Sequence, residues 1–331
     1  MRIGLIGCGH HGRTRLSAAM APIEGVELVA CADVDEAAAA RTAVQWGYSG
    51  VHSDYRRMLQ CEGLDAAMVS LPHHLLAEAS VAVLESGADL FVEKPAGINA
   101  AEAALIRDAA AAAGASVMVG YCMRYNPGRM RARELILGGA VGEPVQTLAC
   151  KSATALENWP SRMEFGGGQL RWHGVHIVDQ VLWVSGVRPV RVHAETRWHP
   201  ETGADRDTAF TIVFEGGLTA SVTVSASLSR PFDFLEVFGT RGRIRSEWPS
   251  EILDVQSDVV AEYETQSRIT PTLPDYNQMY RLQMRDWVDS LASGREPPIP
   301  AQAAVDVLSV IDAAYESARS GSPAAVGTVE R

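Results

Sequence analysis

The sequence predicts an α/β protein of two domains: a doubly wound parallel sheet, then an α/β domain with an open, largely antiparallel sheet. Its 331 residues exceed the usual size of a single hydrophobic core. Short apolar runs alternate with Ala-rich amphipathic segments over the first 120 residues, which is typical of parallel α/β units. Beyond Pro127, strand-like segments follow one another with few helices between them, which indicates antiparallel pairing.

The first domain, residues 1–122, is expected to alternate strands and helices. Its strands are predicted at Arg2–Gly7, Val26–Ala32, Ala66–Ser70, Leu90–Val92 and Ser116–Gly120. Its helices are predicted at His11–Met20, Glu36–Trp46, Asp54–Leu59, Leu75–Leu84 and in an Ala-rich segment that ends at Gly114. Gly47 is the predicted stop of the second helix, and Ser53 is the predicted N-cap of the third. Asn99 and Glu102 have the spacing of a capping box.

The second domain, residues 123–331, is expected to begin with a helix and continue as a sheet. The helix is predicted at Arg129–Leu137, and the strands at Val145–Cys150, Val190–Thr196, Ala209–Phe214, Leu218–Val224 and Phe234–Phe238. Gly216-Gly217 and Thr240-Arg241-Gly242 are predicted turns between strands. Helical periodicity returns at Tyr276–Ala292 and Ala301–Arg319, and whether these helices pack back on the first domain stays open. One face of the sheet is free to meet a second subunit.

Composition restricts the classes of function. A net charge of −11 argues against a nucleic-acid or anionic-membrane partner, although a small anionic substrate could bind in a locally basic pocket. The five cysteines show neither Cys-x-x-Cys pairs nor metal-type spacing, which favours free thiols in a reducing compartment. No signal-peptide pattern or apolar stretch of roughly 18 residues is found, so the cytoplasm is the expected location. The sequence predicts no metal site and no Ser-His-Asp arrangement.

A glycine-rich turn carries the first functional signal. Gly7-Cys8-Gly9-His10-His11-Gly12 fits the pattern G-x-G-x-x-G between an apolar strand and a helix. The first glycine permits a tight turn, the second lets backbone N–H groups approach a pyrophosphate, and the third allows close helix–strand packing. The helix N-terminus then stabilises the phosphate charge. The alternative is a Gly-rich turn without a ligand. The pattern predicts a Rossmann-type dinucleotide site with these residues at the cofactor: Gly7, Gly9, His10, His11 and Gly12.

An acidic residue follows at the distance that such a site requires. Asp33 lies 21 residues beyond Gly12, at the end of the second predicted strand, where a carboxylate binds the adenosine ribose hydroxyls. A carboxylate there repels a 2′-phosphate, so NAD is the predicted cofactor. Arg13 and Arg15 leave NADP open, and a merely solvated aspartate is the alternative.

A lysine follows another buried strand. Leu90-Phe91-Val92-Glu93-Lys94-Pro95 places Lys94 at the carboxyl end of that strand, the edge where doubly wound sheets bind ligands. An ammonium group there can donate to a substrate oxygen and stabilise its developing negative charge. The equally weighted alternative is a surface lysine before a loop proline.

These motifs, together with three others, resemble the Gfo/Idh/MocA family of glucose–fructose oxidoreductases, inositol dehydrogenases and rhizopine-catabolism proteins. The three others are Val119-Gly120-Tyr121-Cys122-Met123-Arg124-Tyr125-Asn126-Pro127, Gly166-Gly167-Gly168 leading to Gly174-x-His176-x-x-Asp179, and Ala313-Ala314-Tyr315-Glu316-Ser317-Ala318. The resemblance covers nearly the whole chain. It implies a Rossmann domain joined to an open-faced α/β domain whose sheet makes dimers or tetramers. It also implies hydride transfer on sugars, cyclitols or related alcohols.

The resemblance implies roles for individual residues. Lys94 contacts the reacting oxygen, and His176 is the acid/base group, since a pKa of roughly 6.5 suits proton exchange near neutral pH. Asp179 is the expected orienting partner of His176, whose alternative role is structural. The implied dinucleotide contacts outside the glycine turn are Asp33, Leu71, Pro72, His73, Glu93, Lys94 and Arg124. The implied substrate contacts, each with a structural role as the alternative, are Tyr121, Asn126, Trp159, Trp172, His173 and Asp179.

Three positions depart from the family's pattern. Family dehydrogenases usually carry an Asp four residues before the histidine, where this chain has Trp172. An indole cannot accept a hydrogen bond there, but it can stack on a sugar face or an aromatic substrate. His173 is either a partial substitute or a packing residue. His73 stands where the family often has Asn, and Leu76 where it often has His, so His73 is expected beside the nicotinamide ribose.

The leading hypothesis is therefore a dehydrogenase or reductase that uses NAD, or else NADP, on a sugar-like small molecule. Two alternatives stay open. One is a lyase or glycosidase that holds NAD tightly for a transient oxidation. The other is a non-catalytic dinucleotide sensor, which the Trp172 departure motivates. A homodimer or homotetramer through the second sheet is expected.

Overall fold

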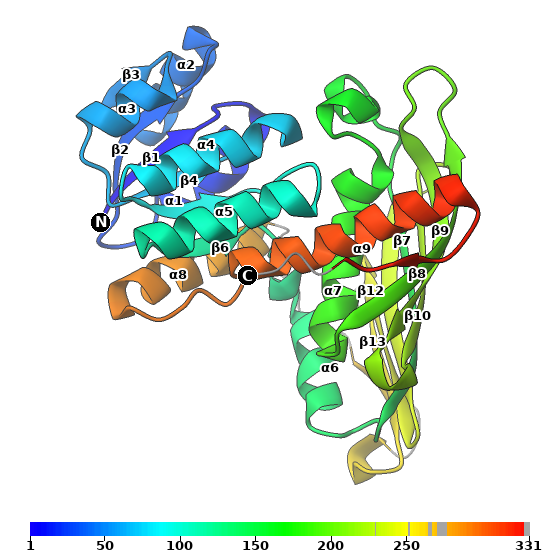
Figure 1. Ribbon diagram of the computed structural model, residues 1–331. Coiled ribbons are helices and arrows are strands. Elements are labelled where there is room, and N and C mark those ends of the chain that lie inside the picture. The colour runs from blue at the N-terminus through cyan, green and yellow to red at the C-terminus, as the bar shows by residue number, and fades with distance from the viewer. Residues whose placement is uncertain (229, 251, 264–266, 270–276, 328–331) are drawn as a thin grey trace. The chain divides into compact units, whose positions relative to one another are not determined.

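Two units, each with its own sheet, make up the chain (Figure 1). The computed structural model describes residues 1–327 except 229, 251, 264–266 and 270–276. The first unit contains Met1–Cys122 and residues 274–305, and the second contains residues 123–273 and 306–330.

The first unit contains a parallel six-stranded sheet in the order β3-β2-β1-β4-β5-β6. The order reverses between β1 and β4, and in such sheets ligands bind outside the carboxyl ends of the strands at this point. Five strands agree with prediction, whereas the three-residue β3 was not predicted. The strands are β1 (Arg2–Ile6), β2 (Glu27–Ala32), β3 (Gly50–His52), β4 (Ala66–Val69), β5 (Asp89–Val92) and β6 (Val117–Val119).

Helices connect these strands, and local capping signals fix most of their ends. Gly47 adopts a left-handed conformation after α2, and the Asn99 side chain accepts from the Glu102 amide at 2.9 Å, so the helix stop and the N-cap are confirmed. The Glu102 carboxylate accepts from the Ile98 amide at 2.9 Å. The Ser53 N-cap was wrong: α3 begins at Tyr55, and Asp54 caps it by accepting from the Arg56 amide at 2.8 Å. The helices are α1 (Ser17–Met20), α2 (Glu36–Trp46), α3 (Tyr55–Cys61), α4 (His73–Glu85) and α5 (Ala100–Ala113).

The helix α8 (Asn277–Ser293), whose packing the sequence analysis left open, belongs to the first unit. Its Trp287 is fully buried, with its ring centroid 5.5 Å from that of Phe91 in β5. Its Gln283 side chain donates to the Val119 carbonyl at 3.1 Å. This apolar face covers the first sheet, which is why the helix packs there. Tyr276, the predicted first residue, lies outside the described residues.

The second unit contains a nine-stranded sheet in the order β14-β13-β12-β11-β7-β10-β9-β8-β15, antiparallel except for the β7–β10 pair. Helices α6 (Pro127–Leu137) and α7 (Val175–Ser185) pack on one face (Figure 1). α9 (Ala301–Ser320) begins in the first unit and ends in the second. The strands are β7 (Pro144–Ser152), β8 (Pro189–Trp198), β9 (Asp205–Phe214), β10 (Thr219–Ser225), β11 (Phe232–Gly239), β12 (Gly242–Trp248), β13 (Leu253–Ser257), β14 (Ser267–Ile269) and β15 (Ala324–Ala325).

Within the described residues, no helix combines the length and the apolarity that crossing a bilayer requires.

Candidate active site

The glycine turn lies between β1 and a π-helical turn, Gly12–Leu16, that leads into α1. The fold itself requires two of its glycines. A Cβ on Gly7 (φ +95°) would lie 2.0 Å from the Ser70 carbonyl oxygen, and one on Gly12 would lie 2.0 Å from that of Gly7. Gly9 differs, because no atom lies within 4 Å of its ideal Cβ and its φ is not left-handed. That open space fits the close approach of a pyrophosphate.

Asp33 lies beside this turn, just after β2. One carboxylate oxygen accepts from the Cys8 amide at 2.7 Å, and the other accepts from the Asp35 amide at 2.9 Å. The side chain is therefore oriented at the carboxyl end of its strand, next to the glycine turn. Sequence reasoning predicted the position of Asp33 but not its bond to Cys8.

His11 and Glu93, both predicted cofactor contacts, lie against each other. The His11 Nε2 atom is 2.9 Å from a Glu93 carboxylate oxygen, and the His11 ring lies edge-to-face with Tyr280 at 5.4 Å. A Cβ on Gly120 would meet the Glu93 carboxylate at 3.0 Å, so a glycine there leaves room for it. The end of β5 is thus tied to the glycine turn by a buried carboxylate. His10 is exposed.

Lys94 lies in a tight turn directly after β5. The turn is closed by the Ala96 amide, which donates to the Glu93 carbonyl at 3.2 Å, and Ala96 has a left-handed φ of +68°. That conformation costs a non-glycine residue roughly 1–2 kcal/mol, and such residues concentrate at functional sites. Only two of the 29 basic residues in the chain are lysines, Lys94 and Lys151. The others are arginines, whose broad planar guanidinium differs from the compact ammonium group of a lysine.

The loop after β4 completes the cofactor half of the site. Pro72 is the N-cap of α4, and His73, the first residue of that helix, is buried. The Leu71 side chain packs beside Gly7. The predicted cofactor residues of the first unit thus follow β1, β2, β4 and β5 at the carboxyl edge of one sheet.

In the second unit, His176 is the second residue of α7, and a π-helical turn, Leu170–Gly174, precedes it. Buried Asp205 anchors that turn, since its carboxylate accepts from the Leu170 amide at 2.8 Å and from the Tyr315 hydroxyl at 2.6 Å. A Cβ on Gly168 would lie 2.1 Å from Asp205 Oδ1, which explains the glycine two residues before the turn. Burial raises the pKa of Asp205, and these hydrogen bonds oppose the rise. Sequence reasoning missed Asp205.

Asp179 was expected to orient His176, but the structure pairs it with Arg124. The Arg124 guanidinium donates to the fully buried Asp179 carboxylate at 2.6–3.1 Å, and it lies 5.6 Å from the Trp183 ring centroid. Burial raises the pKa of Asp179, and the charge of Arg124 only partly offsets the rise. This ion pair fixes α7 against the segment that follows the first unit in sequence.

The remaining predicted substrate residues have the following surroundings. Trp159 and Trp172 lie edge-to-face, with ring centroids 5.2 Å apart. His173 Nδ1 is 2.8 Å from the Gln169 side-chain oxygen, which favours a packing role. Asn126 is the N-cap of α6 and is buried, and Tyr121 is fully buried.

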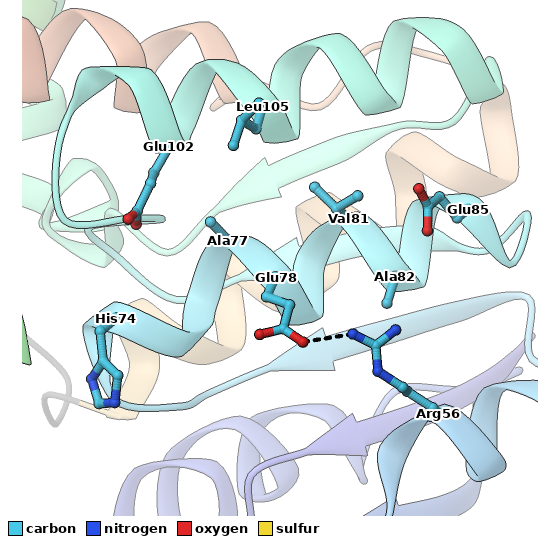
Figure 2. A pocket seen from close by; sticks show the side chains of 9 residues that line it. All are labelled: Arg56, His74, Ala77, Glu78, Val81, Ala82, Glu85, Glu102 and Leu105. Atoms are coloured by element: carbon cyan, nitrogen blue, oxygen red, sulfur yellow. Dashed lines mark hydrogen bonds and ion pairs between the residues drawn. The ribbon is translucent and has the colours of Figure 1, made fainter.

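A surface groove of about 410 Å³ runs along α4 and α5 (Figure 2). Two of its three acidic side chains have partners in this structure: Glu78 is paired with Arg56 at 2.6 Å, and Glu102 accepts from the Ile98 amide at 2.9 Å. It contains none of the predicted site residues. No cluster of three or more His, Cys, Asp or Glu side chains suited to a metal ion occurs in the part of the chain that the structure describes.

Comparison with known proteins covers both units. A family model described as "Oxidoreductase family, NAD-binding Rossmann fold" matches residues 1–121, and one described as "GFO/IDH/MocA C-terminal domain" matches residues 130–245. The D-xylose 1-dehydrogenase (NADP(+)) 2 of Haloferax volcanii is 26% identical, over 97% of this chain and 98% of that protein. Inositol 2-dehydrogenase 1 of Saccharopolyspora erythraea is 25% identical, over 100% and 98%. A levoglucosan dehydrogenase solved in complex with NADH has the same fold, with a TM-score of 0.91, 21% identity, and coverage of 99% and 100%.

Proposed function

Because the chain belongs to the Gfo/Idh/MocA family of NAD-binding oxidoreductases, we propose that it transfers a hydride between nicotinamide and a sugar-like or cyclitol substrate. The reacting carbon carries a hydroxyl or a carbonyl group. The observation that carries the proposal is the common position of Lys94 and the glycine turn at the carboxyl edge of one parallel sheet. Relatives named for xylose and inositol support the substrate class.

Each group has a separate task in this proposal. When bound, NAD accepts or returns the hydride. Lys94 stabilises the negative charge that develops on the substrate oxygen, as preorganised hydrogen-bond donors do at oxyanions. His176 takes the hydroxyl proton during oxidation and returns it during reduction. Gly9 leaves the space in which backbone amides reach the pyrophosphate.

Calorimetry and a substrate panel test the function. We expect the purified chain to bind NAD or NADH and to form NADH, measured by absorbance, with at least one cyclitol or pyranose. Product formation without net NADH would instead support the transient-oxidation lyase or glycosidase. Dinucleotide binding without turnover on any alcohol or carbonyl would support the sensor. A well-folded chain that binds neither NAD nor NADP would contradict all three.

Asp33 is expected to set the preference for NAD over NADP. Replacing Asp33 with asparagine removes a charge-assisted bond to the ribose and the repulsion of a 2′-phosphate. We expect the ratio of the NADP and NAD dissociation constants to fall by about tenfold or more, measured by calorimetry. Asp35→Asn is the matched control, because asparagine caps α2 as well as aspartate does. An unchanged ratio in Asp33→Asn would remove Asp33 from cofactor selection.

We also propose that the open face of the second sheet joins copies of this chain in the cytoplasm. Charged side chains cover part of that face: Glu236 pairs with Arg243 and Arg245 at 3.0 and 2.9 Å, and the Arg245 guanidinium lies 3.9 Å from the Phe234 ring centroid. A partly aromatic face with charges of both signs suits a self-complementary contact. Light scattering after gel filtration measures the oligomeric state.

A further inference from the structure

Two indoles form an aromatic wall, one from the helical segment that carries His176 and one from the turn Trp159–Ser161. The wall consists of Trp159 and Trp172, whose rings make an edge-to-face contact at 5.2 Å with an interplanar angle of 75°. Trp172 precedes His176 by four residues on the continuous helical segment 170–185, so the two are neighbours along that helix. Both indoles are half-buried and retain accessible surface.

Backbone hydrogen bonds anchor the loop that carries Trp159. The Gly167 and Gly168 amides donate to the Arg162 and Pro160 carbonyls at 3.0 and 2.9 Å. A Cβ on Gly167 would lie 2.3 Å from the Pro160 oxygen, so the loop packs too closely for a side chain at that position. A wall that is fixed before binding loses little conformational entropy when a ligand arrives.

We propose that the aromatic wall binds the apolar face of a saturated, hydroxylated ring and thereby selects pyranoses or cyclitols over open-chain polyols. This inference rests on the proposed function, because it takes the ring as the substrate of the hydride transfer. An indole face is electron-rich and attracts the partly positive C–H groups of such a ring. The Trp172 indole has a single donor, Nε1–H, and no acceptor, so we assign most of the affinity at this position to the face of the ring.

Matched probes distinguish binding to a ring from binding to hydroxyl groups alone. Myo-inositol and methyl α-D-glucopyranoside present rings, whereas D-glucitol and D-mannitol carry comparable hydroxyls on an open chain. In the full-length protein we expect the ring probes alone to change the tryptophan fluorescence saturably. Trp172→Leu and Trp159→Leu should each weaken ring binding by about tenfold, and Trp172→Phe should keep most of it, because a phenyl ring also presents a π-face.

Three results would overturn the inference: no response to either ring probe, equal responses to ring and open-chain probes, or unchanged ring affinity in both leucine variants. The phenylalanine variant is a control for misfolding. If ring binding is lost in Trp172→Leu but kept in Trp172→Phe, the loss is due to the missing aromatic face. With a turned-over ring substrate, the leucine variants should raise KM and leave kcat nearly unchanged, because the wall contributes equally to ground and transition states. Failure of the proposed function gives a different pattern, in which ring-dependent fluorescence persists but no ring probe yields NADH.

Discussion

Replacing Lys94 with alanine is expected to lower kcat by about 100- to 1,000-fold while the dissociation constant for NAD stays nearly unchanged. Lys94 lies in the strained turn after β5, at the edge where the parallel sheet binds its cofactor. Its ammonium group is proposed to stabilise negative charge that develops only during the reaction. Removing the ammonium group should therefore slow the chemical step and leave cofactor binding unchanged. Steady-state kinetics measure kcat, and calorimetry measures NAD binding in the same preparation.

Two further variants separate charge from packing. Lys94→Met keeps the length of the side chain but removes the ammonium group, so it should be as slow as alanine. Lys94→Arg keeps the charge but presents a broad planar fork, and we expect it to stay well below the wild type. Turnover close to wild type in Lys94→Met would exclude the lysine from the mechanism.

The parts of the fold that were predictable from the sequence depend on local signals. Buried parallel strands appear as apolar runs, as in β1 and β5, and the cap at Asn99 lies within three residues of its partner. β12 was missed because three of its residues carry charges, Arg243, Arg245 and Glu247. Pairing with β11 and β13 makes this segment a strand, and its own composition does not reveal those pairings.

Prediction of the site was likewise restricted to signals that are local in sequence. The glycine turn, Asp33 and Lys94 could be proposed from the sequence because each motif is contiguous or has fixed spacing. Asp205 was missed because its partners Leu170 and Tyr315 lie 35 and 110 residues away. The Arg124–Asp179 pair, 55 residues apart, replaced the expected contact of Asp179 with His176 for the same reason. Helical spacing alone suggested the nearer partner.

A second large effect is expected at a buried ion cluster in the second unit. Asp233, in β11, is fully buried and accepts from two cations: Arg129 in α6 and Lys151 in β7. The Arg129 guanidinium, also buried, donates to the Ser246 carbonyl at 2.8 Å as well, so this cluster joins a helix to three strands. Burial alone would raise the pKa of Asp233, but Lys151 and Arg129 outweigh it and hold the pKa below its ordinary value.

Asp233→Asn is therefore expected to lower the free energy of unfolding by about 3–5 kcal/mol at neutral pH, because two buried cations lose their shared counter-charge. Thermal and urea unfolding followed by circular dichroism measure the change. Glu215→Gln is the matched control: it removes the same charge from an exposed pair with Arg188 and should cost about 1 kcal/mol or less. The pKa of Asp233 is lower in the folded chain than in the unfolded chain, so its stabilising contribution is present above the unfolded-state pKa. The contribution is lost as the pH falls through the folded-state pKa. The difference in unfolding free energy between wild type and Asp233→Asn should therefore shrink below a pH of about 4. A difference that stays constant down to pH 2, or that equals the control at neutral pH, would show that the cluster does not hold the second unit together electrostatically.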